Sequence, residues 1–224
     1  MKICVIIPAH NESENIGEVV KEIKAKNLDV VVIDDGSVDH SGKIAEEKGA
    51  IVLKNEKKQG KGRSLQKGFD YALQHNYDGV ITMDGDGQHA PSDLDNFIEK
   101  IETGVWGVVV GNRMGQHKQM PLVRYLTNRL MSSLISALCK HNIPDSQCGY
   151  RYIHSDVLKR INLSAKDFEI ETEVLLKAAK KGSQIASVPI KTIYRNEHSK
   201  ISPLKDTIRF FIYIVKEMCS SEND

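Results

Sequence analysis

Short β-branched runs alternate with longer amphipathic segments through the first half of the chain. The runs cover residues 3–8, 30–34, 50–55, 79–84 and 106–113, and helical patterns such as residues 14–27 and 61–75 lie between them. Continuous apolar runs joined by helical segments are typical of a parallel sheet that is buried on both faces. The pattern therefore predicts an α/β fold with a mostly parallel sheet flanked by helices.

The pattern changes to long helices after Pro121. Residues 121–140 predict an amphipathic helix with an apolar stripe, because leucine recurs every four residues. The stripe consists of Leu122, Leu126, Leu130, Leu134 and Leu138. A helical pattern at residues 168–182, a strand pattern at 185–195 and a second amphipathic helix at 203–218 complete the chain.

The last helix is apolar on both faces at its centre. Six apolar residues, Phe210 to Val215, lie between Arg209 and Lys216. Only one face can pack on the core of the same domain. We expect the other face to be buried against this chain or a partner, to form a dimer contact, or to lie in a membrane interface between the flanking basic residues.

Composition and charge narrow the class of protein. With 224 residues, of which 40% are hydrophobic, the chain can build one sizeable core. A formal net charge of +1 argues against a nucleic-acid partner. The four cysteines (Cys4, Cys139, Cys148 and Cys219) show neither disulfide nor zinc spacing, which favours a reducing cytoplasm. We expect no signal peptide and no membrane span, since no apolar run approaches about 20 residues.

Polar clusters follow four of the predicted strands. They are Pro8 to Glu12, Asp34 to Ser37, Asp84 to His89, and Gly111 to Arg113. In an open parallel sheet the carboxyl ends of the strands meet at one edge, which is where ligands bind. We therefore expect the four clusters to form one site.

The sequence DGDGQH pairs two carboxylates, Asp84 and Asp86, at a strand exit. Such a pair raises the pKa of one or both carboxyl groups unless a cation lies between them. Mg²⁺ or Mn²⁺ suits carboxylate oxygens that are completed by water and a substrate diphosphate. The alternative is that the glycines and aspartates only form a tight turn.

The next cluster favours a nucleotide. Asp35 follows a buried strand and could accept hydrogen bonds from a base, while Ser37 could cap the following helix. The alternative for this cluster is an N-terminal capping box alone. Lys61 and Arg63 lie on a glycine-rich segment and indicate a phosphate or base contact, but the spacing of a P-loop is missing.

Six motifs in order resemble a known family. The stretches IIPAHNE, VIDDGS, KG, DGDGQH, GNRM and DSQCGYR are similar to those of family 2 glycosyltransferases of GT-A fold, in particular the branch of dolichol-phosphate mannose synthases and related polyprenyl-phosphate glycosyltransferases. The resemblance covers about residues 1–200, which we interpret as the catalytic domain, with a C-terminal helix and polar tail at 201–224. It implies a Rossmann-like GT-A domain that uses a nucleotide sugar, inverts the anomeric centre and holds Mg²⁺ or Mn²⁺.

The resemblance also implies roles for individual residues. Those expected in the nucleotide-sugar site are Pro8, Ala9, Asn11, Glu12, Asp35, Lys61 and Asp84. Those expected to hold the metal ion are Asp84, Asp86 and Gln88. Those expected at the acceptor phosphate are Arg113, Arg129, Ser133 and Lys200, with Arg124 as a competitor of Arg129. The catalytic set is then Asp86, Arg113 and Arg129.

Arg129 and Ser133 also have a simpler interpretation. They lie four residues apart on the predicted helix of residues 121–140. The alternative to a phosphate clamp is a solvated polar face opposite the leucine stripe.

The acceptor decides the mechanism. A polyprenyl monophosphate is already ionised near neutral pH, because the second pKa of a phosphate is about 6, so no general base is needed. A sugar hydroxyl would need a base, for which the acidic segment offers Glu169, Glu171 and Glu173. The alternative is that these acidic residues only stabilise the N-terminus of a helix. A nucleotidyltransferase and a non-catalytic nucleotide-sugar binder are more distant alternatives.

Two departures from the wider family shape the prediction. The only tryptophan, Trp106, is not in a Q-x-x-R-W motif, so we do not expect a polysaccharide polymerase. Many polyprenyl-phosphate members continue into transmembrane helices, whereas this sequence ends at Asp224. We therefore expect a cytoplasmic enzyme that meets its lipid from outside, peripheral on the cytoplasmic face of the membrane, with a homodimer or a membrane protein as further partner.

Overall fold

A single mixed sheet organises the chain. The computed structural model describes residues 1–115, 120–191, 193 and 210–214. The seven strands are β1 (Ile3–Ala9), β2 (Asp29–Asp34), β3 (Ile51–Lys54), β4 (Gly79–Thr82), β5 (Val108–Asn112), β6 (Arg151–His154) and β7 (Ile185–Pro189). Their order in the sheet is β3-β2-β1-β4-β6-β5-β7. Only β6 is antiparallel to its neighbours, so the prediction of a mostly parallel sheet is confirmed.

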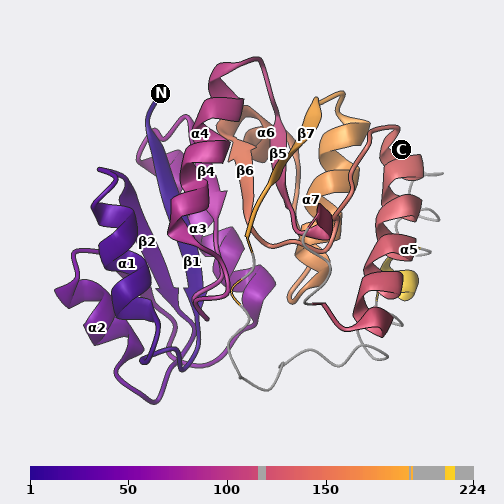
Figure 1. Cartoon of the computed structure of the whole chain (residues 1–224). Helices are drawn as coiled ribbons and strands as arrows, with labels where there is room; N and C mark the ends of the chain where they lie inside the picture. Colours follow the sequence, from indigo (N-terminus) through magenta and orange to yellow (C-terminus); the bar gives the residue numbers. More distant parts are fainter. Residues whose placement is uncertain (116–119, 192, 194–209, 215–224) are drawn as a thin grey trace.

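Helices cover both faces of the sheet (Figure 1). They are α1 (Ile16–Lys24), α2 (Ser41–Glu47), α3 (Lys61–Gln74), α4 (Leu94–Glu102), α5 (Leu122–Cys139), α6 (Ser155–Arg160) and α7 (Glu169–Lys180), with a 3₁₀ turn at Pro91–Asp93. In α1 the apolar residues recur at helical spacing, and Ile16, Val19 and Ile23 are buried. In α3, Gly68 lets the helix approach Ile6 of β1 and Ile33 of β2, since a Cβ at this position would meet both side chains. The helices thus bury the apolar strands on both sides.

Strand β6 enters between β4 and β5 in the reverse direction. Ile81 of β4 pairs with Tyr152, which also pairs with Val109 of β5. The segment before β6 therefore arrives at the edge where β4 ends. This brings residues 145–150 beside Asp84, although more than 60 residues separate them along the chain.

The leucine stripe of α5 has an orientation that its spacing does not predict. Leu122, Leu126 and Leu130 are 69%, 55% and 62% exposed, and Leu134 alone of the stripe packs against the core. The buried face carries Asn128, Met131, Ser132, Ile135 and Cys139. Ser132 donates a hydrogen bond to Ser146 and accepts one from its backbone N–H. Polar contacts of this kind fix the rotation of the helix and leave the leucines outward.

Part of the C-terminal helix lies within the described residues. Residues 210–214 are helical, and they bury Phe210 and Ile214 while leaving Phe211 and Ile212 38% and 63% exposed. One face alone therefore packs on the core, as expected. The rest of the predicted helix, including Arg209 and Lys216, is outside the described part of the chain.

Two further properties concern the whole described structure. Cys4, Cys139 and Cys148 are buried free thiols, and Cys219 is outside the described residues. No helix within residues 1–115, 120–191 or 210–214 combines the length and the hydropathy needed to span a bilayer.

Candidate active site

The carboxylate turn follows β4 at the carboxyl edge of the sheet. Gly87 has a φ of +71°, and the backbone N–H of Gln88 donates to Asp86 Oδ1 at 2.9 Å. The backbone N–H of Asp84 donates to Nδ1 of the buried His89 at 3.2 Å. The turn alternative is therefore correct as a description of the backbone. It does not exclude a cation site, because the turn holds both carboxylates at the sheet edge.

The two carboxylates of the turn differ in charge compensation. Burial would raise the pKa of Asp84, but the ammonium of Lys61 outweighs it and lowers the pKa to about 2. Burial and then the charge of Asp84 raise the pKa of Asp86 to about 6, with a further contribution from Glu12. Burial raises the pKa of a carboxyl group, and a nearby cation lowers it by favouring the charged form. Asp86 is therefore suited to bind a cation.

Lys61 lies between two carboxylates from distant parts of the chain. As the first residue of α3, it places its Nζ 2.5 Å from Asp84 Oδ1 and 2.8 Å from Glu171 Oε1 of α7. Its side chain is 15% exposed, and the ring of Phe168 lies 5.5 Å from Nζ. Gly149 completes this enclosure, since a Cβ there would stand 2.9 Å from Nζ. The lysine thus joins α3, the β4 turn and α7.

The three acidic residues of the segment FEIETE have different environments. Glu173 is fully buried and accepts hydrogen bonds from the backbone of Ser164 and Ala165 and from Lys177. Burial would raise its pKa, but these donors lower it, so Glu173 has a structural role. Glu171 faces Lys61, and its Oε2 is buried without a hydrogen-bond partner among the described residues. Glu169 begins α7 and is partly buried. Of the three, Glu171 is the one at the site.

Arg113 has a partner that the sequence did not indicate. Its Nε and Nη2 donate to the two oxygens of Asp145 at 2.7 and 2.9 Å, and its backbone N–H donates to Asp145 Oδ2. The two residues are 7% and 1% exposed. Burial would raise the pKa of Asp145, and Arg113 lowers it. The predicted acceptor arginine is therefore half of a buried bidentate ion pair.

The cluster around Asp35 is held by internal hydrogen bonds. Its carboxylate is 4% exposed and accepts from Asn55 Nδ2 and from the backbone N–H groups of Gln59 and Gly60, all within 2.9 Å. Burial acts against these donors, but together they lower the pKa of Asp35. Asp35 thus fixes the loop that leads to Lys61. Arg63, which was predicted to contact a phosphate or base, donates its backbone N–H to Lys166 O.

The first strand ends beside this loop. Pro8 and Ala9 are the last residues of β1, and Ala9 O accepts from the backbone N–H of Asp35. Asn11, with a φ of +57°, accepts from the backbone N–H of Val38. Glu12 donates its backbone N–H to Ser41 Oγ. The predicted nucleotide residues of these two strands are thus neighbours at one edge.

The prediction that Ser37 caps the next helix is wrong. Ser37 Oγ accepts from the backbone N–H of Asn11, and α2 starts only at Ser41. The carboxylate of Asp39 accepts from both the backbone N–H and the hydroxyl of Ser41. The start of α2 is therefore supported by an aspartate two residues after the serine that the sequence suggested.

Arg129 and Ser133 lie on the exposed face of α5. Ser133 Oγ donates to the carbonyl of Arg129, one turn earlier, and Arg129 Nη1 lies 3.4 Å from the hydroxyl of Tyr125. At helical spacing the two residues lie on either side of Leu122 and are exposed like it. The alternative of a solvated polar face is therefore correct in that both side chains are exposed, but this face is shared with the leucines and does not lie opposite them. Lys200 lies outside the described residues.

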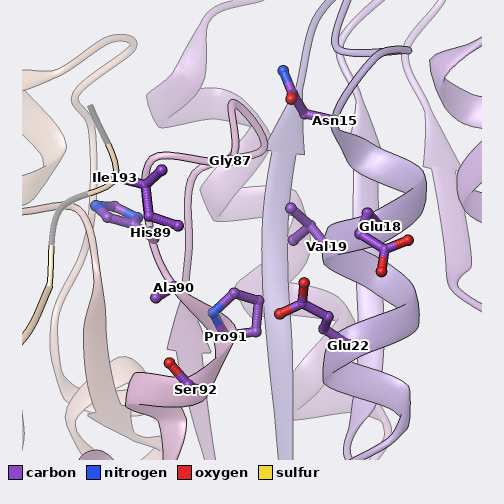
Figure 2. A pocket seen from close by; sticks show the side chains of 10 residues that line it. All are labelled: Asn15, Glu18, Val19, Glu22, Gly87, His89, Ala90, Pro91, Ser92 and Ile193. Carbon is purple, nitrogen blue, oxygen red and sulfur yellow. The ribbon is translucent and has the colours of Figure 1, made fainter. Parts of the chain in front are cut away.

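Gln88 and the region behind the turn complete the site. The carbonyl of Gln88 accepts from the backbone N–H of Ile193. Behind the turn, a pocket of about 190 Å³ lies between α1 and the loop (Figure 2). Its lining includes Asn15, Glu18 and His89, but none of the described residues to which the resemblance gives a role. Its volume is below the roughly 300 Å³ at which small-molecule sites begin, so we assign it to the support of the turn.

His89 stiffens the turn as a neutral side chain. Burial lowers its pKa to about 4, and the nearby charge of Asp84 does not reverse this. Because Nδ1 accepts from a backbone N–H, the proton of the neutral ring is on Nε2. Its ring lies 5.1 Å from that of Tyr150.

Three residues of this site had no predicted role. They are Asp145, Gly149 and Arg151, all in or next to the quoted motif DSQCGYR. Arg151 is 2% exposed and donates to the backbone carbonyls of Ser146, Cys148 and Glu171. The signal that could have found them was the concentration of charge and glycine in a short segment between two helical patterns.

The site combines uncompensated negative charge with buried cations. Asp86 forms no ion pair within the described part of the chain, while Lys61 and Arg113 are held nearby by carboxylates. Within the described residues, no three His, Cys, Asp or Glu side chains are close enough together to form a metal site by themselves. Two carboxylates and an amide do fit an ion whose other ligands come from water and a diphosphate.

Comparisons with known proteins agree with this geometry. The model of the family "Glycosyl transferase family 2" matches residues 4–161. A UDP-N-acetylglucosamine–dolichyl-phosphate N-acetylglucosaminyltransferase of Methanococcus voltae is 33% identical over 94% of this chain and 93% of its own length. An undecaprenyl-phosphate mannosyltransferase of Micrococcus luteus is 30% identical over 87% of this chain and 85% of its own.

A solved structure shares the fold. Glucosyl-3-phosphoglycerate synthase from Mycobacterium tuberculosis, crystallised with Mn²⁺, UDP and phosphoglyceric acid, superposes with a TM-score of 0.71. It is 22% identical, and the match covers 88% of this chain and 72% of that chain. At this identity the likeness concerns the fold alone, and it confirms the predicted GT-A architecture.

Proposed function

This chain belongs to glycosyl transferase family 2, and from that premise we propose that it transfers a sugar, with inversion, from a nucleotide sugar to a polyprenyl monophosphate. It is an enzyme that transfers sugar. The proposal for the acceptor agrees with the names of its relatives, which act on dolichyl phosphate and on undecaprenyl phosphate.

Asp84, Asp86 and Gln88 would hold Mg²⁺ or Mn²⁺ against the donor diphosphate. The raised pKa of Asp86, caused first by burial and then by Asp84, supports this assignment. When bound, the ion would stabilise the negative charge of the leaving nucleoside diphosphate. The structure with Mn²⁺ and UDP belongs to a protein of the same fold and supports the choice of metal. Pro8, Ala9, Asn11, Glu12, Asp35 and Lys61 would form the surrounding nucleotide-sugar site.

The composition of the exposed face of α5 is the observation that supports a polyprenyl phosphate as the acceptor. It presents Leu122, Leu126 and Leu130 together with Arg129 and Ser133, and α5 contains no acidic residue. An ionised phosphate on an apolar chain is complementary to this face, because it joins one anionic group to a long apolar surface. Arg129 and Ser133 would bind the phosphate, and Lys200 would join them. Arg113 would contribute its charge from within the ion pair with Asp145.

The ionised phosphate oxygen would attack the anomeric carbon from the face opposite the leaving group. No side chain has to remove a proton, so the chain only has to position the acceptor and reduce its repulsion from the donor. The alternative acceptor is a sugar hydroxyl, which needs a general base. Glu171 is the residue that favours this alternative, since its Oε2 is buried without a described partner. The other oxygen, Oε1, is held by Lys61 at 2.8 Å.

The experiment is a transfer assay with a panel of labelled UDP- and GDP-sugars, polyprenyl phosphate and Mg²⁺ or Mn²⁺. We expect label from one donor in the organic phase, loss of this label with Asp86→Asn, and a smaller loss with Glu171→Gln. Metal-dependent hydrolysis of one donor without a lipid product would move the acceptor to a hydroxyl. Release of pyrophosphate would instead indicate a nucleotidyltransferase, and binding without turnover a sensor.

We also propose that the enzyme is peripheral on the cytoplasmic face of a membrane, with α5 in contact with the lipid. The double change Leu126→Asp and Leu130→Asp is expected to lower the partition onto vesicles containing anionic lipid by about tenfold or more, because burial of each leucine contributes about 1.5–3 kcal/mol. Co-sedimentation measures this. Val105→Asp is the matched control, since Val105 is 93% exposed but lies between α4 and β5. Equal vesicle binding by the wild type, the double leucine variant and Val105→Asp would exclude the α5 face as the membrane contact.

Gly149→Ala is expected to weaken nucleotide-sugar binding by roughly tenfold with little loss of stability. The new Cβ would stand 2.9 Å from Lys61 Nζ and 3.0 Å from Asp84 Oδ2, so the lysine has to move while the backbone does not. Calorimetric titration and thermal melting measure the two effects. Gly115→Ala is the control, because a Cβ there meets none of the described residues within 4 Å. A large drop in Tm with unchanged binding would contradict the prediction.

A further inference from the structure

Lys61 occupies one oxygen of a carboxylate that the metal ion would also need. Its Nζ is 2.5 Å from Asp84 Oδ1, and Asp84 is two residues from Asp86. A divalent ion bound to both aspartates would therefore lie next to an ammonium group. Two cations at such a distance repel each other strongly in a partly buried site. The ion and Lys61 are competitors unless Lys61 finds another anion.

The surroundings of Lys61 hold its ammonium group on Asp84. Glu171 holds it from the other side at 2.8 Å, and the backbone at Gly149 closes the space around Nζ. Its side chain is 15% exposed, whereas that of Lys43 on α2 is 71% exposed. A lysine that is taken from water needs its carboxylate partners. Lys61 will therefore leave Asp84 only for a new anion at the same place.

We propose that Lys61 is a positioning residue that makes metal binding conditional on the nucleotide. Without donor, its ammonium neutralises Asp84 and disfavours a divalent ion. When the donor arrives, its diphosphate gives Lys61 an alternative anion and frees Asp84, so the ion and the nucleotide bind as one unit. After transfer, departure of the nucleoside diphosphate returns Lys61 to Asp84 and favours release of the ion. This inference rests on the proposed donor site and goes beyond it.

The test is the binding of Mn²⁺ alone, followed by the electron paramagnetic resonance signal of the free ion, with and without UDP or GDP. We expect the wild type to bind Mn²⁺ weakly alone and more tightly with one nucleoside diphosphate. Lys61→Met is expected to bind Mn²⁺ alone about tenfold or more tightly than the wild type, since a nearby positive charge is removed. The increase in Mn²⁺ affinity that the nucleoside diphosphate causes should be smaller in Lys61→Met than in the wild type. Lys43→Met should behave as the wild type.

A double variant that keeps the net charge of the wild type covers the case in which Lys61→Met alone does not fold. Lys61→Met with Glu171→Gln removes one positive and one negative charge, and it is compared with Glu171→Gln alone. We expect the double variant to bind Mn²⁺ alone about tenfold or more tightly than the single one. Circular dichroism verifies that each variant is folded.

Two results would overturn the inference, and they differ in meaning. Equal or weaker binding of Mn²⁺ alone after loss of Lys61, with a normal nucleotide effect in the wild type, would reject the role of Lys61 and leave the donor site intact. If neither nucleoside diphosphate binds to the wild type or changes its Mn²⁺ affinity, the proposed donor site fails as well.

Discussion

Asp86→Asn is expected to abolish sugar transfer and, at the same time, to stabilise the protein in the absence of metal. The loss of transfer should be about 10²-fold or more, because the proposed placement of the ion depends on this carboxylate. Asparagine keeps the size of the side chain and the oxygen that accepts from the backbone of Gln88. The change therefore removes a charge with little effect on the shape of the turn.

The gain in stability follows from the raised pKa of Asp86. Burial and Asp84 raise this pKa from 3.8 to about 6, so the folded state binds the proton more tightly than the unfolded state. The stability that this tighter proton binding contributes is fully present below pH 3.8 and is lost as the pH rises through 6. At pH 7.5 the ionised carboxylate costs the fold about 1–3 kcal/mol, and asparagine removes this cost.

Urea unfolding in the presence of a chelator, at pH 7.5 and at pH 4, measures this effect. The free energy of unfolding of Asp86→Asn should exceed that of the wild type at pH 7.5 and approach it at pH 4. Asp95→Asn, which changes an exposed carboxylate on α4, is the control and should show neither effect. Full transfer activity in Asp86→Asn would refute the metal assignment. A loss of stability at pH 7.5 would refute the raised pKa.

Asp145→Ala is expected to give the largest loss of stability among single changes at the site. It leaves the guanidinium of Arg113 buried without the carboxylate that accepts its bidentate hydrogen bonds. Removing one partner of a buried ion pair costs about 3–5 kcal/mol. For a chain of this length the Tm should fall by roughly 6–20 °C. Transfer should fall as well, since Arg113 loses its fixed position.

A surface ion pair gives the matched comparison. Lys26 and Asp95 are 2.7 Å apart, but the side chain of Asp95 is 73% exposed. Asp95→Ala should therefore cost less than about 1 kcal/mol. Asp145→Asn, which keeps the shape, covers the case in which the alanine variant does not fold. A change of less than about 1 kcal/mol in both Asp145 variants would show that Arg113 does not depend on Asp145.

The sheet and the strand-end site could be predicted because local pattern determines them. β1, β2 and β4 are continuous apolar runs, and the turn that carries Asp84 and Asp86 directly follows the β4 run. The prediction that the clusters share one edge needed only the rule that parallel strands end together. The structure agrees for the end of β1 and Asp35, because the backbone N–H of Asp35 donates to Ala9 O.

The partners of the charged residues could not be predicted, because they depend on tertiary contacts. Strand β6 is four residues long and begins with Arg151, so it has no strand signal of its own. Its position decides that Asp145 meets Arg113 and that Gly149 meets Lys61. The rotation of α5 was equally hidden, since contacts of Ser132 with Ser146, and not the leucines, select its buried face.

The insertion of β6 has a consequence for synthesis of the chain. β4 pairs with β1 on one side and with β6 on the other, and β5, although made earlier than β6, touches β4 only through it. While the ribosome is still making residues 113–150, β1 to β4 can already form a four-stranded sheet whose β4 edge is open and apolar. Arg151–His154 then closes this edge and joins the two parts of the sheet. The nascent chain is therefore most vulnerable to aggregation just before residue 154 emerges, and β6 is the strand whose delay would prolong that interval.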